Sequence, residues 1–221
     1  MRSLLSALTL LAGLLLALPA SAQGFISPVS SISPKQPAYV ELPDGSKVEG
    51  TVPLAMFMNG GLRSFTLLTS GGEKMKFKAG DVTVLANKPG ALAKLSALGN
   101  QMDSKWDMIT ADWGEVIDRE WVYYRQALMP NGKSYALLQL INPGFDSRLQ
   151  VFNQDPEEPD EYLVVKDGKI SVKITKGNYK KSFGDLFGDC AKLMEPDTSK
   201  KPKVKDFAAH AYIFDRACGK K

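Results

Sequence analysis

Two cysteines, Cys190 and Cys218, are the only ones in the chain. Both fall on apolar stripes of consecutive predicted helices, residues 179–194 and 203–218, which a short proline-bounded segment joins. In an exported chain a lone pair of this kind typically forms a disulfide. We therefore predict a Cys190–Cys218 disulfide across the two helices. The alternative is two buried thiols that pack as small apolar residues.

A single histidine, His210, limits the other reactions that the chain could carry out. Metal sites and catalytic motifs that need two histidines are excluded, and no Walker loop, G-x-S-x-G, G-x-G-x-x-G or C-x-x-C motif occurs. His210 lies beside the apolar stripe of the last predicted helix, where a packing role is expected. The sequence thus indicates no catalytic residue, no cofactor-binding residue and no metal ligand.

Carboxylates leave two alternatives open. Glycoside hydrolases need only a pair of carboxyl groups, which Asp118, Glu120 or Asp146 could supply, although nothing singles these residues out. The stretch from Asp155 to Glu161 holds five carboxylates in seven residues, and their oxygens could bind Ca²⁺. Its spacing differs from an EF-hand loop and its prolines separate neighbouring side chains, so a solvated acidic loop is favoured.

Aromatic residues cluster at Trp121, Tyr123 and Tyr124. They could line a binding groove. In a strand, however, such residues more often pack in the core or form cross-strand pairs, which is the structural alternative.

The first 22 residues, Met1–Ala22, have the pattern of a secretory signal peptide. Arg2 precedes the apolar run Leu4–Leu18, which is shorter than the roughly 20 residues of a membrane-spanning helix. We predict cleavage between Ala22 and Gln23, and hence no stable membrane span afterwards. The remaining chain has a weak positive charge, which gives no reason to expect a nucleic-acid partner.

The chain then divides into segments that predict an α+β fold. Residues 23–37 form a flexible leader rich in serine and proline, and a docked strand is the alternative. Residues 38–88 contain five short strands, which predict a small SH3-like or Sm-like β-barrel. Residues 89–118 carry an amphipathic helical connector, broken near Gly99 and Asn100.

The second half is expected to be an antiparallel sheet over residues 119–177 and a helical hairpin over residues 178–221. The strand Tyr135–Ile141 is apolar on both faces and should therefore lie in mid-sheet. Pro143–Gly144 predicts a type II turn, and Asp167–Gly168 predicts a tight hairpin turn.

Several segments resemble an uncharacterised family of exported proteins of Gram-negative bacteria. They are REWVYYRQAL (119–128), ALLQLINPGFDSRLQVF (136–152), EYLVVKDGK (161–169), NYKKSFGDLFGDC (178–190) and the closing Lys-Asp-Phe…Cys218 helix. The resemblance covers mainly the C-terminal half. It implies export and a shared fold, and it supplies no catalytic residues.

Together these features predict a periplasmic or secreted protein that acts by binding an envelope protein or a glycan, without a cofactor. A carboxylate-dependent envelope hydrolase that acts on glycan is the main alternative. A nucleic-acid-binding barrel is a weaker one, suggested by fold analogy alone.

Overall fold

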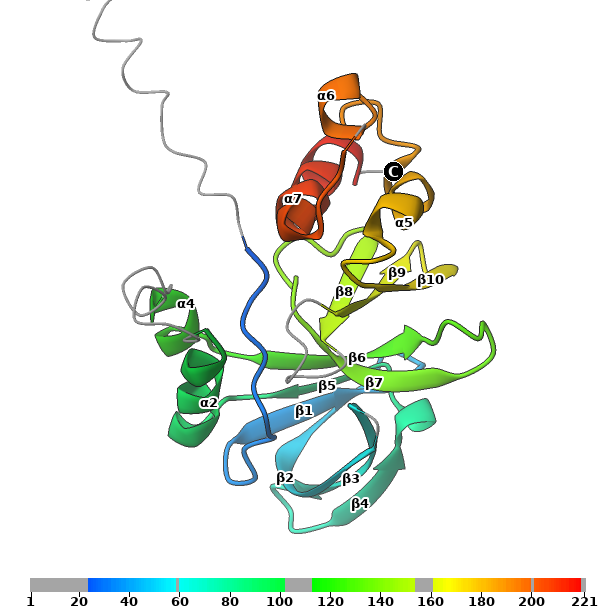
Figure 1. The fold of residues 1–221 in the computed structure, drawn as a ribbon. Helices are drawn as coiled ribbons and strands as arrows, with labels where there is room; N and C mark the ends of the chain where they lie inside the picture. The colour runs from blue at the N-terminus through cyan, green and yellow to red at the C-terminus, as the bar shows by residue number, and fades with distance from the viewer. Residues whose placement is uncertain (1–23, 59, 102–112, 154–160, 200, 220–221) are drawn as a thin grey trace, which may run out of the picture.

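The computed structural model describes residues 24–58, 60–101, 113–153, 161–199 and 201–219. The predicted signal peptide and its cleavage site after Ala22 lie outside these residues, and so does the acidic stretch up to residue 160. The protein has a mixed α+β fold (Figure 1), in which ten antiparallel strands form one sheet.

Six of the ten strands close into a barrel, in the cyclic order β1, β2, β3, β7, β6, β5. A single pair, Leu62 with Leu137, joins β3 to β7 and completes the ring. Strand β4 extends β3 outside the ring, and β8, β9 and β10 continue the sheet beyond β7. The bounds are β1 Pro37–Glu41, β2 Lys47–Met58, β3 Gly61–Thr69, β4 Lys74–Lys78, β5 Val84–Asn87, β6 Val122–Leu128, β7 Tyr135–Leu140, β8 Leu149–Asn153, β9 Tyr162–Lys166 and β10 Ile170–Ile174.

The predicted closure of residues 38–88 into a barrel of their own is wrong. Strands β6 and β7, which we assigned to a separate sheet, complete the ring. They can do so because β4 pairs only with Ser64–Leu68 of β3, which leaves Leu62 available to β7. β7 is paired along both edges, as its two apolar faces predicted.

The barrel interior follows from strand alternation. Inward-facing side chains such as Val40, Leu67 and Leu85 are fully buried, while their neighbours in sequence face outward. Helices α2 (Ala91–Gln101) and α4 (Trp113–Ile117) add Ala97 and Val116 to the same core. Both helices lie within the predicted connector.

The segment before β1 is docked against the protein, so the predicted flexible leader is a second correction. Val29 is buried in the barrel core, whereas Phe25 stacks on Phe145 at 5.9 Å in a different core. Polar side chains also hold its backbone: Asn87 accepts from Ser33 N at 2.8 Å, and Arg119 donates to the Ser27 carbonyl at 2.6 Å. The few apolar residues of this segment are spaced so that they reach both cores. The polar composition of the segment gave no indication of this docking.

The second core lies between β8–β10 and the C-terminal helices (Figure 1). These helices are α5 (Tyr179–Phe187), the short α6 (Pro196–Ser199) and α7 (Phe207–Cys218), and the 3₁₀ turn η3 (Val204–Asp206) leads into α7. The first predicted helix ends early, because Gly188 caps α5. Cys190 therefore lies in the turn after α5 and not on the helix.

The turns were predicted with mixed success. Asp167 and Gly168 both have positive φ, as their hairpin turn requires. The turn at Pro143–Gly144 is closed by Phe145 N and the Asn142 carbonyl at 3.1 Å, but Gly144 lacks the positive φ of a type II turn. The buried Asn142 side chain holds this loop from inside, because its amide group donates to the carbonyls of Phe145 and Leu149.

Across the described part of the chain, no helix is both long and apolar enough to cross a membrane.

Candidate functional site

A groove of about 650 Å³ lies on the outer face of the barrel. Outward-facing side chains of β1 and β2 form its floor, and the end of β3 and the residue before β6 form its walls. Its lining residues are Lys35, Pro37, Ala38, Tyr39, Lys47, Glu49, Gly50, Thr51, Leu68, Thr69, Ser70, Lys88 and Trp121.

Backbone pairing places these side chains together. Tyr39 of β1 is paired with Glu49 of β2 on one side and with Ala86 of β5 on the other. Residues that are directly paired project to the same face of a sheet, so Tyr39 and Glu49 both face the groove. Gly50 allows β2 and β3 to lie close together, because a Cβ atom there would lie 2.2 Å from the Leu68 carbonyl oxygen.

An aromatic pair forms the most distinctive part of the groove. The rings of Tyr39 and Trp121 pack edge to face, with centroids 5.2 Å apart. A lysine ammonium lies over each ring: Lys47 Nζ is 4.7 Å from the Tyr39 centroid, and Lys88 Nζ is 5.1 Å from that of Trp121. Both rings remain partly accessible on the outer surface.

The charges of the groove are largely balanced. Lys47 pairs with Glu41 at 2.8 Å, and this hydrogen bond raises the pKa of the lysine. Lys88 pairs with Glu120 at 3.2 Å. Among the described residues that line the groove, Glu49 is the one carboxylate, and Thr51, Thr69 and Ser70 supply aliphatic hydroxyl groups. The groove therefore combines aromatic surface with hydroxyl, carboxylate and ammonium groups, which suits binding of a polar ligand that also has an apolar face.

The three aromatic residues selected from the sequence have different positions. Trp121 lines the groove, and Tyr123 lies beside it on the same outer face, where burial raises the pKa of its phenol. Tyr124 points into the barrel and is buried, which raises its phenol pKa strongly. Tyr39 was not predicted as a groove residue, although the alternation of Ala38, Tyr39 and Val40 indicated an outward aromatic residue.

The three candidate hydrolase carboxylates have different surroundings. Asp118 is exposed, Glu120 pairs with Lys88, and Asp146 forms an ion pair with Arg125. Burial raises the pKa of Asp146, against the opposing effect of Arg125. None of the three lines the groove.

His210 is buried in the second core. Its Nδ1 atom lies 2.7 Å from the Tyr179 hydroxyl, and the rings of Phe183 and Phe187 pack around it. Burial lowers the pKa of the imidazole, while the charge of Asp206 acts in the opposite direction. The histidine is thus a packed, hydrogen-bonded core residue.

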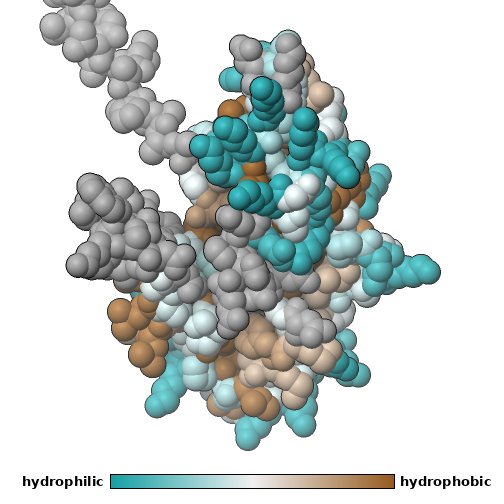
Figure 2. All heavy atoms as spheres, in the orientation of Figure 1, coloured by the Kyte–Doolittle hydropathy of each residue, from teal (hydrophilic) through white to brown (hydrophobic). Residues whose placement is uncertain are grey.

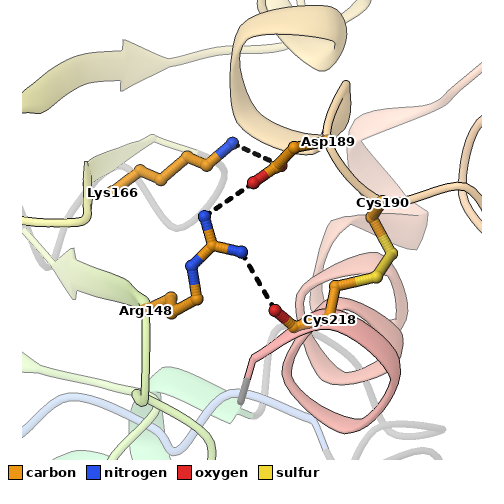
Figure 3. The surroundings of a disulfide bond; sticks show 5 residues. All are labelled: Arg148, Lys166, Asp189, Cys190 and Cys218. Carbon is orange, nitrogen blue, oxygen red and sulfur yellow. Dashed lines mark hydrogen bonds and ion pairs between the residues drawn. A yellow bond between two sulfur atoms is a disulfide. The ribbon is translucent and has the colours of Figure 1, made fainter. Parts of the chain in front are cut away.

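The two cysteines are at disulfide distance, with 2.12 Å between the sulfur atoms and 5.6 Å between the Cα atoms. A network of charges adjoins them (Figure 3). Arg148 donates to Asp167, to Asp189 and to the Cys218 carbonyl at 2.6–2.9 Å, and Lys166 donates to Asp189 at 2.7 Å. The Arg148 and Lys166 side chains are 12% and 7% exposed. This network attaches the end of α7 and the turn after α5 to the residue before β8 and to the end of β9.

The same network sets the pKa of Asp189. Its partial burial raises the pKa, but the hydrogen bonds from Lys166 and Arg148 outweigh this, so the pKa is lowered. Asp189 remains a carboxylate well into the acidic range.

No cluster of three metal-ligating side chains occurs among the residues that the structure describes. The Ca²⁺ alternative depends on residues 155–160, which lie outside this set. Glu161, the last residue of that stretch, pairs with Lys173 at 2.5 Å.

No protein-family model matches this chain, and neither the comparison with curated proteins nor that with solved structures finds a match. The resemblance to a family of exported proteins therefore stays a prediction from the sequence.

Proposed function

We propose that this is an exported protein of the cell envelope or extracellular space, which binds a glycan in the barrel groove without chemical turnover. One observation carries the proposal: the partly accessible Tyr39–Trp121 pair that lines a groove with hydroxyl side chains.

Glycans match the chemistry of this groove. A sugar ring has apolar C–H faces that pack on aromatic rings, and its hydroxyls exchange hydrogen bonds with polar side chains. Thr51, Thr69 and Glu49 supply such partners along the groove. The ammonium groups of Lys47 and Lys88 already have acidic partners, which favours a neutral or weakly charged ligand over a polyanion.

The proposal is tested with the purified chain from Gln23 onward, titrated with a panel of soluble oligosaccharides by calorimetry. Saturable binding should weaken about tenfold in Trp121→Ala, because stacked aromatic anchors dominate binding energy. Tyr135→Ala is the matched control, since Tyr135 is 55% exposed and lies outside the groove. Binding of no panel member, or equal loss in both variants, would contradict the proposal.

The same titrations distinguish binding from hydrolysis. Retaining and inverting glycosidases use two carboxyl groups about 5–9.5 Å apart, whereas the part of the chain that the structure describes lines the groove with a single carboxylate, Glu49. Release of shorter oligosaccharides, abolished in Glu49→Gln, would replace the binding proposal with the hydrolase alternative.

Export and cleavage are a separate part of the proposal. Mass spectrometry of the protein from its cells should give an N-terminus at Gln23. Retention of Met1–Ala22 in a membrane fraction would contradict it.

A helical hairpin of residues 178–221 completes the proposal. Its support is that α5 and α7 share one core and that Cys190 and Cys218 lie at bonding distance. In this arrangement the hairpin covers the β8–β10 extension and leaves the barrel groove open.

A further inference from the structure

A second cavity, of about 390 Å³, lies in the C-terminal helical layer, where α5 begins and where the chain enters α7. Two separate segments form it, the start of α5 and the residues around η3. Its lining residues are Lys176, Tyr179, Lys180, Pro202, Lys203, Val204 and Lys205.

Four of these seven residues are lysines, and all four are exposed. Within the described part of the chain, none of the four has an ion-pair partner. This distinguishes them from Lys47 and Lys88 of the groove, which each pair with a glutamate. Four ammonium groups around one hollow repel one another, and a bound anion would relieve that repulsion.

The other walls of the cavity are apolar. Tyr179 is buried and directs its hydroxyl to His210, so its ring, together with Pro202 and Val204, forms a non-polar surface. Asp206 is the acidic residue whose charge acts on Tyr179, and it offsets part of the positive potential. The N-terminus of the nine-residue helix α5 contributes in the opposite direction, through the positive end of its dipole.

The charge distribution of the whole chain agrees with this local one. Residues 169–221 contain twelve lysines and one arginine against six carboxylates, whereas acidic residues are in excess over the rest of the chain. Figure 2 shows hydrophilic side chains gathered over the C-terminal helices. The weak net charge of the protein thus conceals a basic C-terminal region.

We propose that this cavity is a second binding site, specific for a phosphate group carried by an organic molecule. The lysines bind the phosphate oxygens through charge-assisted hydrogen bonds, and the apolar wall accepts the carbon skeleton attached to it. The volume exceeds what a phosphate group alone requires. A soluble phosphate ester and a phospholipid headgroup share this chemistry.

Calorimetric titration with glycerol 3-phosphate at low salt tests the site. The double variant Lys176→Gln/Lys203→Gln, with one change on each side of the cavity, should bind at least about tenfold more weakly. The control Lys74→Gln/Lys133→Gln removes the same charge from exposed positions outside the cavity and should bind within about twofold of the unaltered protein. Absence of saturable binding, or equal loss in the two double variants, overturns the proposal.

Vesicle flotation identifies the source of the phosphate. If vesicles of phosphatidylglycerol retain the protein, while those of phosphatidylcholine do not and the cavity variant is released, the ligand is a lipid headgroup. If only glycerol 3-phosphate binds, the ligand is soluble. Trp121→Ala leaves both measurements unchanged, because Trp121 belongs to the groove. The two binding proposals are therefore tested independently of each other.

Discussion

The barrel and the C-terminal layer solve the problem of exposed strand edges in different ways. Closure of the ring by β3 and β7 satisfies the barrel strands through backbone pairing. The β8–β10 extension remains open and ends at β10. Its helical cover is attached to the sheet by the Arg148 network, and the Cys190–Cys218 pair joins the end of α7 to the turn after α5 within that cover. Where the sheet does not close on itself, side-chain links to the covering helices replace backbone pairing.

The two regions also use lysine differently. In the groove two of the three lysines, Lys47 and Lys88, place their ammonium groups over aromatic rings and pair with carboxylates, whereas the lysines of the C-terminal cavity gather without acidic partners among the described residues. The charges of Lys47 and Lys88 are neutralised without a ligand. The cavity lysines would gain more electrostatic stabilisation from a bound anion. The comparison leads us to expect ligands of different charge at the two ends of the molecule.

Removal of the covalent link should have the largest effect. The double variant Cys190→Ser/Cys218→Ser should lose about 3–4 kcal/mol of unfolding free energy, because the link restricts the unfolded chain. Denaturant unfolding followed by circular dichroism measures this loss. The barrel should keep its hydrogen-exchange protection, and equal loss of protection in β1–β3 would show that the two regions do not differ as described.

The docked leader supplies the next test, because it contributes to both cores. Phe25→Ala should cost about 2–3 kcal/mol, since Phe25 contacts Phe145, Tyr162 and Phe207 but is only partly buried. Val29→Ala should cost about 1–2 kcal/mol and affect the barrel core instead. If the melting temperature is unchanged in both variants, residues 23–37 would have to be interpreted as a flexible leader after all.

Loss of the buried charge network should follow in size. Arg148→Met removes the guanidinium hydrogen bonds that Asp167 and Asp189 accept and should cost about 2 kcal/mol, less than for a fully buried pair because Asp189 is 43% exposed and keeps its bond to Lys166. The matched change at an exposed pair, Lys47→Met, should leave the melting temperature unaltered. Similar shifts of the melting temperature in Arg148→Met and Lys47→Met would show that charge pairs stabilise the two regions equally.

The smallest effect is expected from pH. Burial lowers the pKa of His210 below its ordinary value of 6.5, so the unfolded chain binds the proton more readily than the folded one. Stability should therefore decrease as the pH falls below about 6.5, and this loss should be absent in His210→Gln. Asp189 contributes a separate loss only at lower pH, below the ordinary carboxyl value of 3.8. A free energy of unfolding that stays constant between pH 7 and pH 5 would contradict the lowered pKa of His210.

Local features of the fold were predictable from the sequence, because short-range chemistry determines them. The turn at Asp167–Gly168 and the two apolar faces of β7 are examples. The pairing partners of a strand were not predictable in this way. The alternation of apolar and polar residues shows which face of a strand is buried, but not which strand lies beside it. The pairing of Leu62 with Leu137 therefore had no signal in either segment.

The candidate site was predictable only in part, for the same reason. Trp121 was recognised as a possible groove residue, but its partner Tyr39 lies far away in the sequence, and the contact depends on the pairing of β5 with both β1 and β6. The four cavity lysines come from two segments that meet only when η3 packs beside α5. Each segment alone has the composition of a solvated loop.

The Leu62–Leu137 pair also governs the order in which the protein can fold. A chain that emerges N-terminus first presents β1–β5 long before β6 and β7, so one edge of β5 stays unpaired while the connector is produced. Such late, non-local pairing slows folding and favours edge-to-edge association in the interval. A fragment that ends before Val122 should accordingly aggregate, and addition of β6 and β7 should be the step that makes it soluble.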